Sequence, residues 1–450
     1  MRRELLIAAG PGEWRAALLE DGVPAELFVE RGDRSETGSI HLGRVSRLVP
    51  GLSAALVDIG EERPAFLPQG EVVPRGQRLN EGERLMVQIR REAQGGKAAR
   101  VTMAVALRGR LVELTVGRPG LKCGEGLSPG DRDQLLAAFD EGPTGLRLLE
   151  PAPVEATAAE AAALGARWCV ILDRASRLDP PARVDPVATF AAALASALPV
   201  APNQILVDEP SAVPDIRAAF SNISVEHLPE AEWPIDLDGA FAGSLAETIA
   251  LPGGGSIHFE TTRAGVLIDV DTGTPEAGSP QRIGLATNLA AARSIARQIR
   301  LRNLGGPIVI DFVGLDSRGS RERVRAALAG ALASDLAQPQ ILGWTRLGHL
   351  ELVRPRRGRP LAEALLERRP GGALVKTAVA VSHEALRGLR REARAQPGRS
   401  WRLIVAPDVA TSLAGRAEPA VKEAERRFAR KIAIEADSGY DRERFQIIPL

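Results

Sequence analysis

The chain has 450 residues, of which 44% are hydrophobic and 26% are charged, as expected of folded globular domains. Its length favours roughly three to five domains, because one domain usually holds about 100–200 residues. The 58 basic and 57 acidic side chains leave a formal charge of +1, which excludes a protein that coats nucleic acid through its overall charge.

The N-terminal residues predict a strand, since their apolar stretch is too short for the core of a signal peptide. Other apolar runs, such as 103–107 and 190–195, fall well short of the roughly 20 residues of a membrane span. Cys123 and Cys169 are the only cysteines, which excludes a disulfide scaffold and fits a reducing compartment. We therefore expect a cytoplasmic protein with no membrane span.

The N-terminal part of the chain predicts a hairpin followed by a barrel. Alternating residues at 15–19 and 25–30 flank Asp21 and Gly22, a pair typical of hairpin turns. Short strand-like segments separated by glycines then follow within residues 38–102. Five such strands suit a small closed barrel of the OB type.

Residues 105–210 give a mixed pattern. The alternating pieces LVELTV, GLRLLE and WCVILD predict strands, whereas residues 153–165 are rich in alanine and glutamate, as in a helix. A helix at 186–198 and a strand at 205–210 continue an α/β pattern.

A strand–helix–strand unit is predicted at 264–313. An apolar strand at 264–271 is followed by an amphipathic helix at 283–303. The nearly unbroken apolar content of 307–313 predicts a second strand, buried on both faces. Strands joined in this way are almost always parallel.

The C-terminal part continues the α/β pattern, with a helix at 321–336 and a strand at 348–353. The Pro-, Arg- and Gly-rich stretch 354–372 predicts an exposed arm or linker. Strand and helix patterns in residues 373–450 predict a small α/β domain.

Three aspartates stand at the ends of the two parallel strands. Asp269 and Asp271 are two residues apart and project to the same face, and Asp311 lies near the end of the second strand. Parallel strands bring their carboxyl ends to one sheet edge, where open α/β sheets bind ligands. Carboxylates repel one another unless a cation balances them, and Mg²⁺ favours such ligands together with substrate phosphates. The trio therefore predicts a metal site suited to phosphodiester hydrolysis.

Other interpretations of these acids stay open. A single aspartate at a strand end more often caps the following loop, and the Asp-x-Asp pair also resembles that of aspartate-nucleophile phosphatases. Those phosphatases have a small hydroxyl residue or valine two positions after the second aspartate, where this chain has Gly273. No P-loop, Rossmann or nucleophile-elbow motif is present. The histidines show no ligand spacing and predict structural roles; they are His41, His227, His258, His349 and His383.

The predicted barrel carries residues that suit single-stranded nucleic acid, which such barrels bind by stacking bases on aromatic rings and pairing phosphates with cations. Phe66 begins one strand and Lys97 lies in a glycine-flanked loop. Core packing is an equally weighted interpretation of Phe66, and a solvated face is the default for the arginines. The candidate phosphate contacts are Arg44, Arg47, Arg90, Arg91 and Arg100.

The order of several segments resembles the catalytic region of the bacterial ribonuclease E/G family. They are GSIHLGRVSRLVPGLSAALVDIGEERPAFLP, LMVQIRREAQGGKAARVT, LIDVDTG, TNLAAARSIARQIRLRNLGGPIVIDFVGL and TRLGHLELVR. The likeness runs from about residue 36 to the C-terminus and is strongest over 256–353. It implies a single-strand-specific endoribonuclease that depends on Mg²⁺, with Mn²⁺ as an alternative ion.

The resemblance also implies an architecture and a set of site residues. The metal-holding aspartates fall on Asp269 and Asp311, with Asp271 at a position where the family has asparagine. The stacking and phosphate-contact positions of the barrel include Phe66 and Lys97, to which the barrel's local positive charge adds Arg44 and Arg100 as RNA-binding candidates. The implied domains are an RNase H-like fold (1–35 with 181–244), an inserted OB-fold barrel of the S1 type (36–104), a 5′-sensor-like region (105–180), a DNase I-like catalytic domain (245–362) and a small C-terminal domain (373–450).

Four departures from the family pattern change these expectations. No cysteine stands within 355–372, so we expect no structural zinc, and any homo-oligomer would not form through a shared zinc. Leu149 and Glu150 occupy the positions of the residues that contact a 5′-monophosphate, which predicts loss of 5′-end sensing. The remaining departures are Leu56 and Ile59 in place of barrel aromatics and Arg263 in place of an acid.

We therefore expect an endoribonuclease that cleaves single-stranded RNA and leaves 5′-phosphate products. The first alternative is an RNA-binding or ribosome-associated protein that has lost cleavage, which the missing zinc pair, sensor residues and aromatics favour. The second alternative is a metal-dependent phosphatase.

Overall fold

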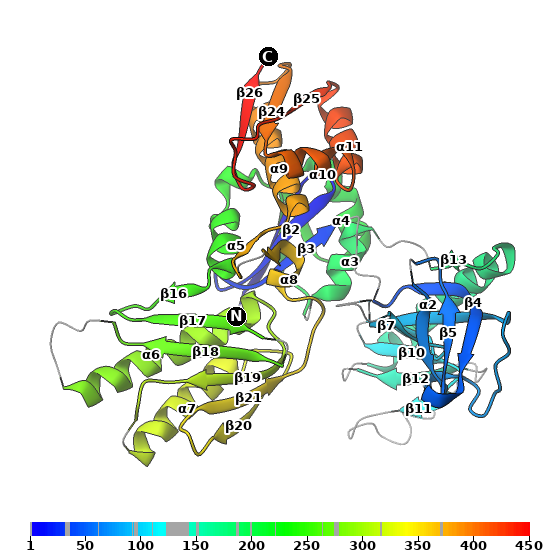
Figure 1. Ribbon diagram of the computed structural model, residues 1–450, viewed down its shortest axis with the longest axis horizontal. Coiled ribbons are helices and arrows are strands. Elements are labelled where there is room, and N and C mark those ends of the chain that lie inside the picture. Colours follow the sequence, from blue (N-terminus) through cyan, green and yellow to red (C-terminus); the bar gives the residue numbers. More distant parts are fainter. Residues whose placement is uncertain are drawn as a thin grey trace. The chain divides into compact units, whose positions relative to one another are not determined.

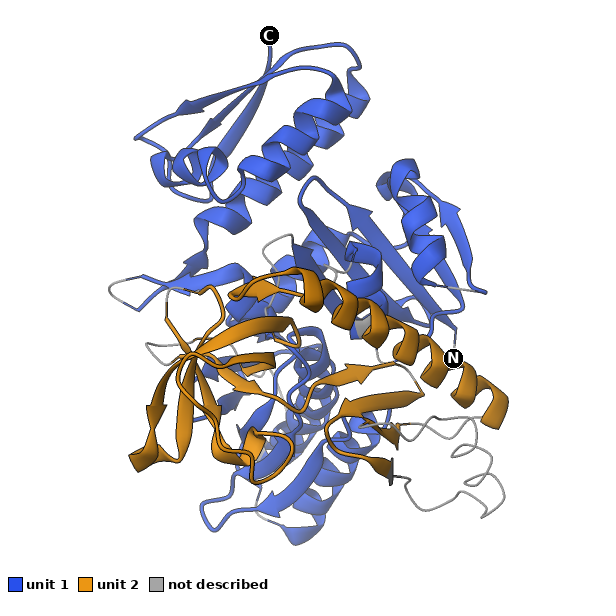
Figure 2. Cartoon of the chain, turned by 90° about the vertical axis from the view of Figure 1, so that its right-hand side faces the viewer, with its two compact units in different colours: residues 1–33, 189–450 blue, residues 34–188 orange. Residues whose placement is uncertain are grey.

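The computed structural model describes most of the chain, namely residues 2–31, 37–61, 63–91, 93, 98–109, 111–122, 144–149, 153–185, 189–198, 200–220, 222–262, 264–273, 279–315, 317–369 and 372–450. The chain forms two compact units, residues 1–33 with 189–450 and residues 34–188 (Figure 2). No helix in the described part of the chain is both long enough and apolar enough to cross a membrane.

The first unit begins with a five-stranded sheet in the order β15-β14-β1-β2-β3; Figure 1 labels β2 and β3 of it. Its strands are β1 (Arg3–Ala9), β2 (Glu13–Glu20), β3 (Val23–Arg31), β14 (Gln204–Val207) and β15 (Ser224–His227). The expected N-terminal strand and hairpin are confirmed, and Asp21 and Gly22 take positive φ angles of 50° and 81° at the turn. Helices α3 (Phe190–Ala197) and α4 (Val213–Ala219) pack on one face of this N-terminal sheet, and α5 (Leu237–Leu245) on the other.

A mixed six-stranded sheet, here called the central sheet, follows in the order β16-β17-β18-β19-β21-β20 (Figure 1). Strands β18 and β19 are parallel, as predicted, and every other neighbouring pair is antiparallel. The strands are β16 (Thr248–Ala250), β17 (Ser256–Thr261), β18 (Val266–Asp271), β19 (Gly306–Asp311), β20 (Gln340–Trp344) and β21 (Leu350–Arg354).

Among the described residues, helices cover one face of the central sheet and not the other. Helices α6 (Pro280–Leu301) and α7 (Arg318–Leu332) pack on the covered face through a core that includes Ile268 and Ile310. On the other face, Leu267, Asp269 and Asp271 of β18 are exposed, as is Asp311 of β19. The prediction that 307–313 is buried on both faces is therefore wrong, because both crossover helices lie on the same side of the sheet.

The C-terminal residues form a three-stranded sheet in the order β25-β24-β26, packed against α9, α10 and α11. This arrangement matches the α/β pattern expected at 373–450. The elements are α9 (Ala378–Ala395), β24 (Trp401–Val405), α10 (Pro407–Ala414), α11 (Glu418–Phe428), β25 (Ile432–Ala436) and β26 (Phe445–Pro449), preceded by the β22 (Leu366–Arg368) and β23 (Leu374–Lys376) pair.

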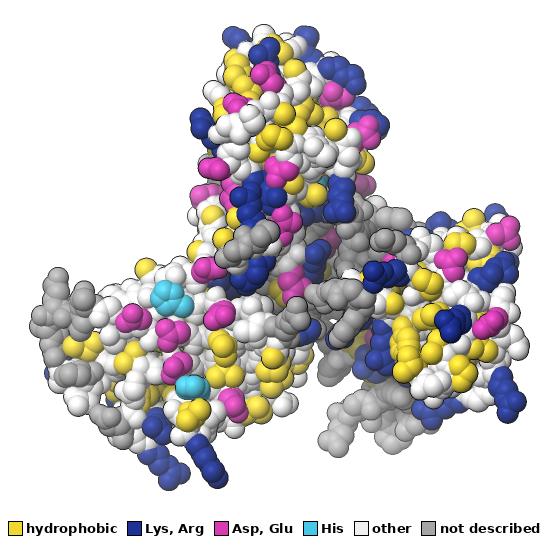
Figure 3. All heavy atoms as spheres, in the orientation of Figure 1, with side chains coloured by type: hydrophobic (Ala, Val, Ile, Leu, Met, Phe, Trp, Pro, Cys, Tyr) yellow, Lys and Arg dark blue, Asp and Glu magenta, His cyan; other side chains and the backbone are white. Residues whose placement is uncertain are grey.

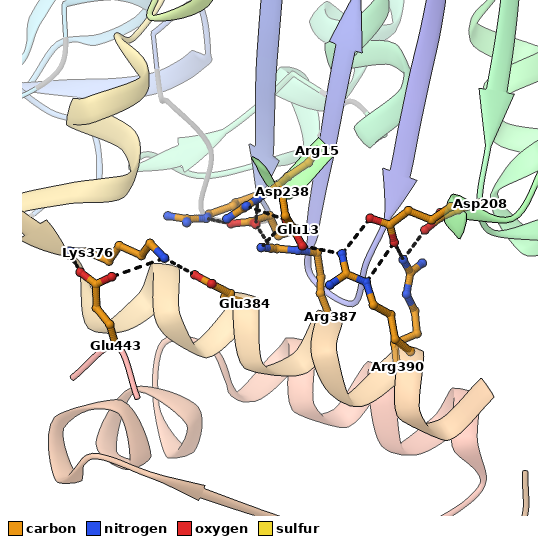
Figure 4. A network of polar contacts seen from close by, with 12 residues as sticks. Glu13, Arg15, Asp208, Asp238, Lys376, Glu384, Arg387, Arg390 and Glu443 are labelled. Atoms are coloured by element: carbon orange, nitrogen blue, oxygen red, sulfur yellow. Dashed lines mark hydrogen bonds and ion pairs between the residues drawn. The ribbon is translucent and has the colours of Figure 1, made fainter. Parts of the chain in front are cut away.

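Helix α9 is joined to the N-terminal sheet by buried charges (Figure 4). Glu13 of β2 is 0% exposed and accepts hydrogen bonds from Arg387 of α9, from Arg15 Nε at 2.9 Å and from Arg31 Nε at 2.6 Å. Burial alone would raise the pKa of Glu13, but Arg15, Arg387 and Arg31 outweigh it and hold the pKa well below its usual range. The carboxylate is therefore charged in the folded protein.

A second buried pair lies one turn further along α9. Arg390 donates to the Asp208 carboxylate at the end of β14 and, at 3.1 Å, to the carbonyl oxygen of Ala9. Its neighbour Arg391 is 45% exposed and donates to Glu230 at 2.7 Å. The buried arginines therefore face the N-terminal sheet, while Arg391 lies at the rim.

The second unit contains a closed five-stranded barrel. Its strands pair in the order β4-β5-β6-β8-β7, and β7 pairs back to β4. The closed barrel predicted for residues 38–102 is confirmed. Its strands are β4 (Ile40–Val49), β5 (Ala54–Asp58), β6 (Ala65–Pro68), β7 (Arg84–Arg91) and β8 (Arg100–Thr102), and β13 (Ala182–Arg183) extends the sheet beside β4.

A smaller sheet in the order β11-β12-β10-β9 packs with α2 (Val154–Arg177) in the same unit. The predicted strand WCVILD, at 168–173, is wrong because it lies inside α2. The buried residues Leu164, Ile171 and Ala175 share one helical face, so packing of that face decides the structure. The strands are β9 (Ala106–Arg108), β10 (Val112–Val116), β11 (Gly120–Lys122) and β12 (Thr144–Leu148).

The exposed arm expected at 354–372 is wrong in part: Arg354 and the leucines of 361–365 are buried, whereas residues such as 355, 356, 358 and 359 are exposed. Arg354 is 2% exposed and its Nε donates to Asp335 Oδ2 at 2.7 Å. A short helix follows, α8 (Leu361–Leu365), whose leucines Leu361 and Leu365 are buried in the core shared with the N-terminal sheet. Two leucines four residues apart lie on one helical face. The many prolines and arginines around them made this short helical pattern hard to recognise in the sequence.

Candidate active site at the ends of β18 and β19

Asp269 and Asp311 are direct neighbours on the central sheet. They are register partners on parallel strands β18 and β19, and both lie on the face without helices. Adjacent strands are about 4.8 Å apart, so the two side chains leave the sheet next to each other. The side chain of Asp311 is 57% exposed, which leaves it open to a substrate.

Asp271 lies on the same face, one step further along β18. Its Cα partner on the other side is Ser256 of β17, and its Oδ1 accepts a hydrogen bond of 2.9 Å from the backbone of Gly273. Among the residues that the structure describes, no three His, Cys, Asp or Glu side chains are grouped closely enough to hold a metal ion. The structure thus pairs Asp269 with Asp311, and it does not bring all three predicted acids around one point.

These acids stand without an arginine or lysine partner among the residues that the structure describes. A contact with a basic group comes instead from an imidazole: His349 Nε2 lies 3.7 Å from Asp311 Oδ2. Figure 3 shows acidic and histidine side chains gathered on the lobe that contains this sheet. Sequence reasoning gave His349 only a structural role, because its place beside Asp311 depends on the register of β19 with β21.

The donor set fits a hard divalent cation. Mg²⁺ takes oxygen ligands, usually one or two carboxylates completed by water and substrate phosphates. Asp269 and Asp311 supply two carboxylates from adjacent strand ends, and the exposed face leaves room for phosphate oxygens. A structural zinc site needs four protein ligands, commonly cysteine and histidine, and the carboxylate pair does not resemble one.

The outer face of the barrel carries Phe66 in a row that also contains arginines. Ala65 and Leu67 point into the barrel core, whereas Phe66 is half-buried and lies outside that core, so the core-packing interpretation of Phe66 is wrong. Register pairs place Phe66 beside Leu56 on one side and Arg100 on the other. Arg47 pairs with Leu56 at one end of this row, and Arg91 pairs with Arg100 at the other end.

The other predicted barrel and sensor positions differ in their surroundings. Arg44 is exposed, although its guanidinium donates to the Gly82 carbonyl oxygen at 3.0 Å. Ile59 is 3% exposed in the barrel core and offers no surface to a base. Leu149 follows β12, and its backbone N–H donates to Leu111. Lys97, Glu150 and Arg263 lie outside the described residues.

Fold and site together define a multidomain α/β protein with a closed barrel and a carboxylate pair on an open sheet face. The sequence of residues 150–357 matches the family model of the ribonuclease E/G family. Ribonuclease G of Salmonella typhimurium is 28% identical over 100% of both chains, and Ribonuclease G of Haemophilus influenzae is 26% identical over 99% of both. Ribonuclease E of Nostoc sp. is 31% identical over 77% of this chain and 55% of that protein. The chain belongs to the ribonuclease E/G family.

Proposed function

We propose that this protein is an endoribonuclease of RNA processing or decay, which cleaves single-stranded RNA and leaves 5′-phosphate products. One observation carries the proposal: Asp269 and Asp311 are register partners on an open sheet face, at the positions where the family resemblance puts the metal-holding aspartates. Relatives named Ribonuclease G that align over the whole chain support the same reaction.

Asp269 and Asp311 hold a Mg²⁺ ion in this proposal, with Mn²⁺ as an alternative, and Asp271 adds negative charge on the same face. The ion, when bound, supplies positive charge to a phosphodiester and activates water for its hydrolysis. The two carboxylates keep the ion at a strand end, where the open face admits an extended RNA chain. Asp271 influences how the scissile phosphate lies, because its side chain projects beside the pair.

The proposed architecture follows the family resemblance. Residues 1–35 with 181–244 form an RNase H-like fold, 36–104 an OB barrel of the S1 type, 105–180 a 5′-sensor-like region, 245–362 a DNase I-like domain and 373–450 a small domain. Leu149 and Glu150 support loss of 5′-end sensing, because neither side chain offers the positive charge that a 5′-phosphate needs. No cysteine lies within 355–372, so a homo-oligomer would form without a shared zinc.

Phe66→Ala is expected to weaken binding of single-stranded RNA by about 1–3 kcal/mol, because the ring loses its stacking with a base. Arg100→Ala should reduce the slope of log affinity against log salt by about 1, since one phosphate contact is lost. Fluorescence anisotropy with a labelled single strand, at several salt concentrations, measures both effects. Arg177→Ala on the surface of α2, where the arginine is paired with Asp173, is the control and should change neither. An affinity independent of salt would contradict the barrel surface.

The substrate class tests the proposed reaction against its alternatives. A labelled A/U-rich single strand and a small phosphomonoester are incubated separately with the protein and Mg²⁺. We expect internal cleavage of the RNA and no turnover of the monoester. Turnover of the monoester alone would indicate the phosphatase, and RNA binding without cleavage would indicate a protein that has lost the reaction.

A further inference from the structure

Four side chains form one row across the open face of the central sheet. His258 of β17 is the register partner of Asp269, and Asp269 is the partner of Asp311. Ile310 pairs with Leu350 in the antiparallel β19–β21 ladder, so the next position of β19, Asp311, lies opposite His349. The paired carboxylates are therefore flanked on each side by an imidazole.

The two histidines differ in what their ring nitrogens contact. His258 Nδ1 lies 2.9 Å from the hydroxyl oxygen of Thr248, and its Nε2 lies 3.2 Å from that of Ser256. Both nitrogens of His258 are thus engaged with hydroxyl groups. His349 instead presents Nε2 to Asp311 Oδ2, at 3.7 Å.

The backbone of His349 is fixed by the tight connection between β20 and β21. Thr345 N–H donates to the His349 carbonyl oxygen at 2.8 Å, and His349 N–H donates to the Thr345 hydroxyl oxygen at 3.1 Å. Gly348 takes a φ of +97°, a conformation that favours glycine, just before His349. Two hydrogen bonds and the turn at Gly348 therefore hold the backbone of His349 in place opposite Asp311. The side chain is 35% exposed, so a substrate on this face can cover it.

We propose that His349 is a positioning residue of the carboxylate pair: its Nε2–H group donates to Oδ2 of Asp311 and fixes the orientation of that carboxylate. This inference rests on the proposed function, since it concerns the group that holds the divalent ion there. The 3.7 Å separation is longer than a hydrogen bond, so the proposal requires a side-chain rotation that shortens it. Hydrogen bonds in such sites are often long in the free protein and tighten when substrate binds.

The orientation of Asp311 matters because the carboxylate is exposed and stands at the end of its strand. With no arginine or lysine paired to it in the described residues, Asp311 is free to rotate unless His349 restrains it. Partners that orient a metal ligand typically change metal affinity or activity by about 10- to 100-fold when they are removed. His349 thus acts through Asp311, and the chemistry stays with the two carboxylates.

The test compares three substitutions of His349 with one at His258. His349→Leu removes the donor, His349→Gln places an amide N–H near the former Nε2, and His349→Asn places one near the former Nδ1. His258→Leu is the matched control on the same face, because both of its ring nitrogens are engaged by the hydroxyl groups of Thr248 and Ser256. The readouts are Mn²⁺ affinity without RNA, from electron paramagnetic resonance of the free ion, and kcat and KM for RNA cleavage.

We expect His349→Leu to weaken Mn²⁺ binding and lower kcat by about 10- to 100-fold, with KM for RNA unchanged. His349→Gln should recover most of both losses and exceed His349→Asn, while His258→Leu should match the wild type. Equal Mn²⁺ affinity in wild type, His349→Leu and His349→Asn would overturn the inference if Asp311→Asn still abolishes binding. If Asp311→Asn also leaves Mn²⁺ binding and cleavage intact, the proposed function itself fails.

Discussion

Asp269→Asn and Asp311→Asn are each expected to lower kcat/KM for cleavage of single-stranded RNA by on the order of 10³-fold, about 4 kcal/mol. Each substitution removes one negative charge from the donor set without changing the volume of the side chain. Both positions lie on an exposed face, so the folded structure should keep its stability to within about 0.5 kcal/mol. Initial rates with an end-labelled oligonucleotide at saturating Mg²⁺ measure the effect.

The matched control for these substitutions is Glu260→Gln. Glu260 is an exposed acid on the same face, on neighbouring strand β17, but its register partner is Leu267 and not one of the aspartates. Its neutralisation should leave cleavage unchanged. Near-normal cleavage by Asp269→Asn or Asp311→Asn would remove the pair from the reaction, whereas an equal loss with Glu260→Gln would indicate an effect of overall charge.

Arg387→Met is expected to destabilise the fold by about 3–5 kcal/mol, because it leaves the fully buried Glu13 carboxylate without one of its cations. Burial, and the charge of Arg15, lower the pKa of Arg387 to about 10, still far above neutrality, so the lost group is a cation. Arg391→Met, at the rim of the same helix, should cost less than about 1 kcal/mol. Urea unfolding of the full chain compares the two. A similar loss of unfolding free energy in both variants would contradict the role of the buried Glu13–Arg387 pair.

The same network predicts how stability depends on pH. The pKa of Glu13 is lower in the folded chain than its usual value, so the stability that this carboxylate contributes is fully present above the usual range of glutamate. That contribution is lost as the pH falls through the usual range toward the folded-state value. Glu13→Gln should therefore be less stable than wild type at neutral pH, and the difference should shrink in acid. A difference that stays constant with pH would show that Glu13 is not held charged by its arginines.

Local pattern was sufficient to predict the carboxylate pair. Apolar runs that end in Asp269 and Asp311, separated by an amphipathic helix, define parallel strands whose ends must meet. The closed barrel could be predicted for a similar reason, since its five strands are consecutive and each is marked by glycine or a turn. In both cases the interacting residues are brought together by short-range rules.

The features that sequence reasoning missed depend on packing between distant segments. Glu13 and Arg387 are 374 positions apart, and nothing local marks either as a buried partner. His349 reaches Asp311 only through the antiparallel register of β21 with β19, which its own neighbourhood does not specify. In α2, the alternating residues of WCVILD fit a strand in isolation, and burial of Ile171 against the small sheet favours the helix instead.

The central claim is that a divalent ion held by Asp269 and Asp311 drives internal cleavage of single-stranded RNA. The most direct measurement follows a 5′-labelled A/U-rich strand with the wild-type protein in Mg²⁺, in EDTA, and in EDTA followed by excess Mg²⁺. We predict internal fragments that disappear in EDTA and return on addition of Mg²⁺, and none in any condition with the double variant Asp269→Asn/Asp311→Asn. Fragments that persist in EDTA, or that the double variant still produces, would contradict the claim.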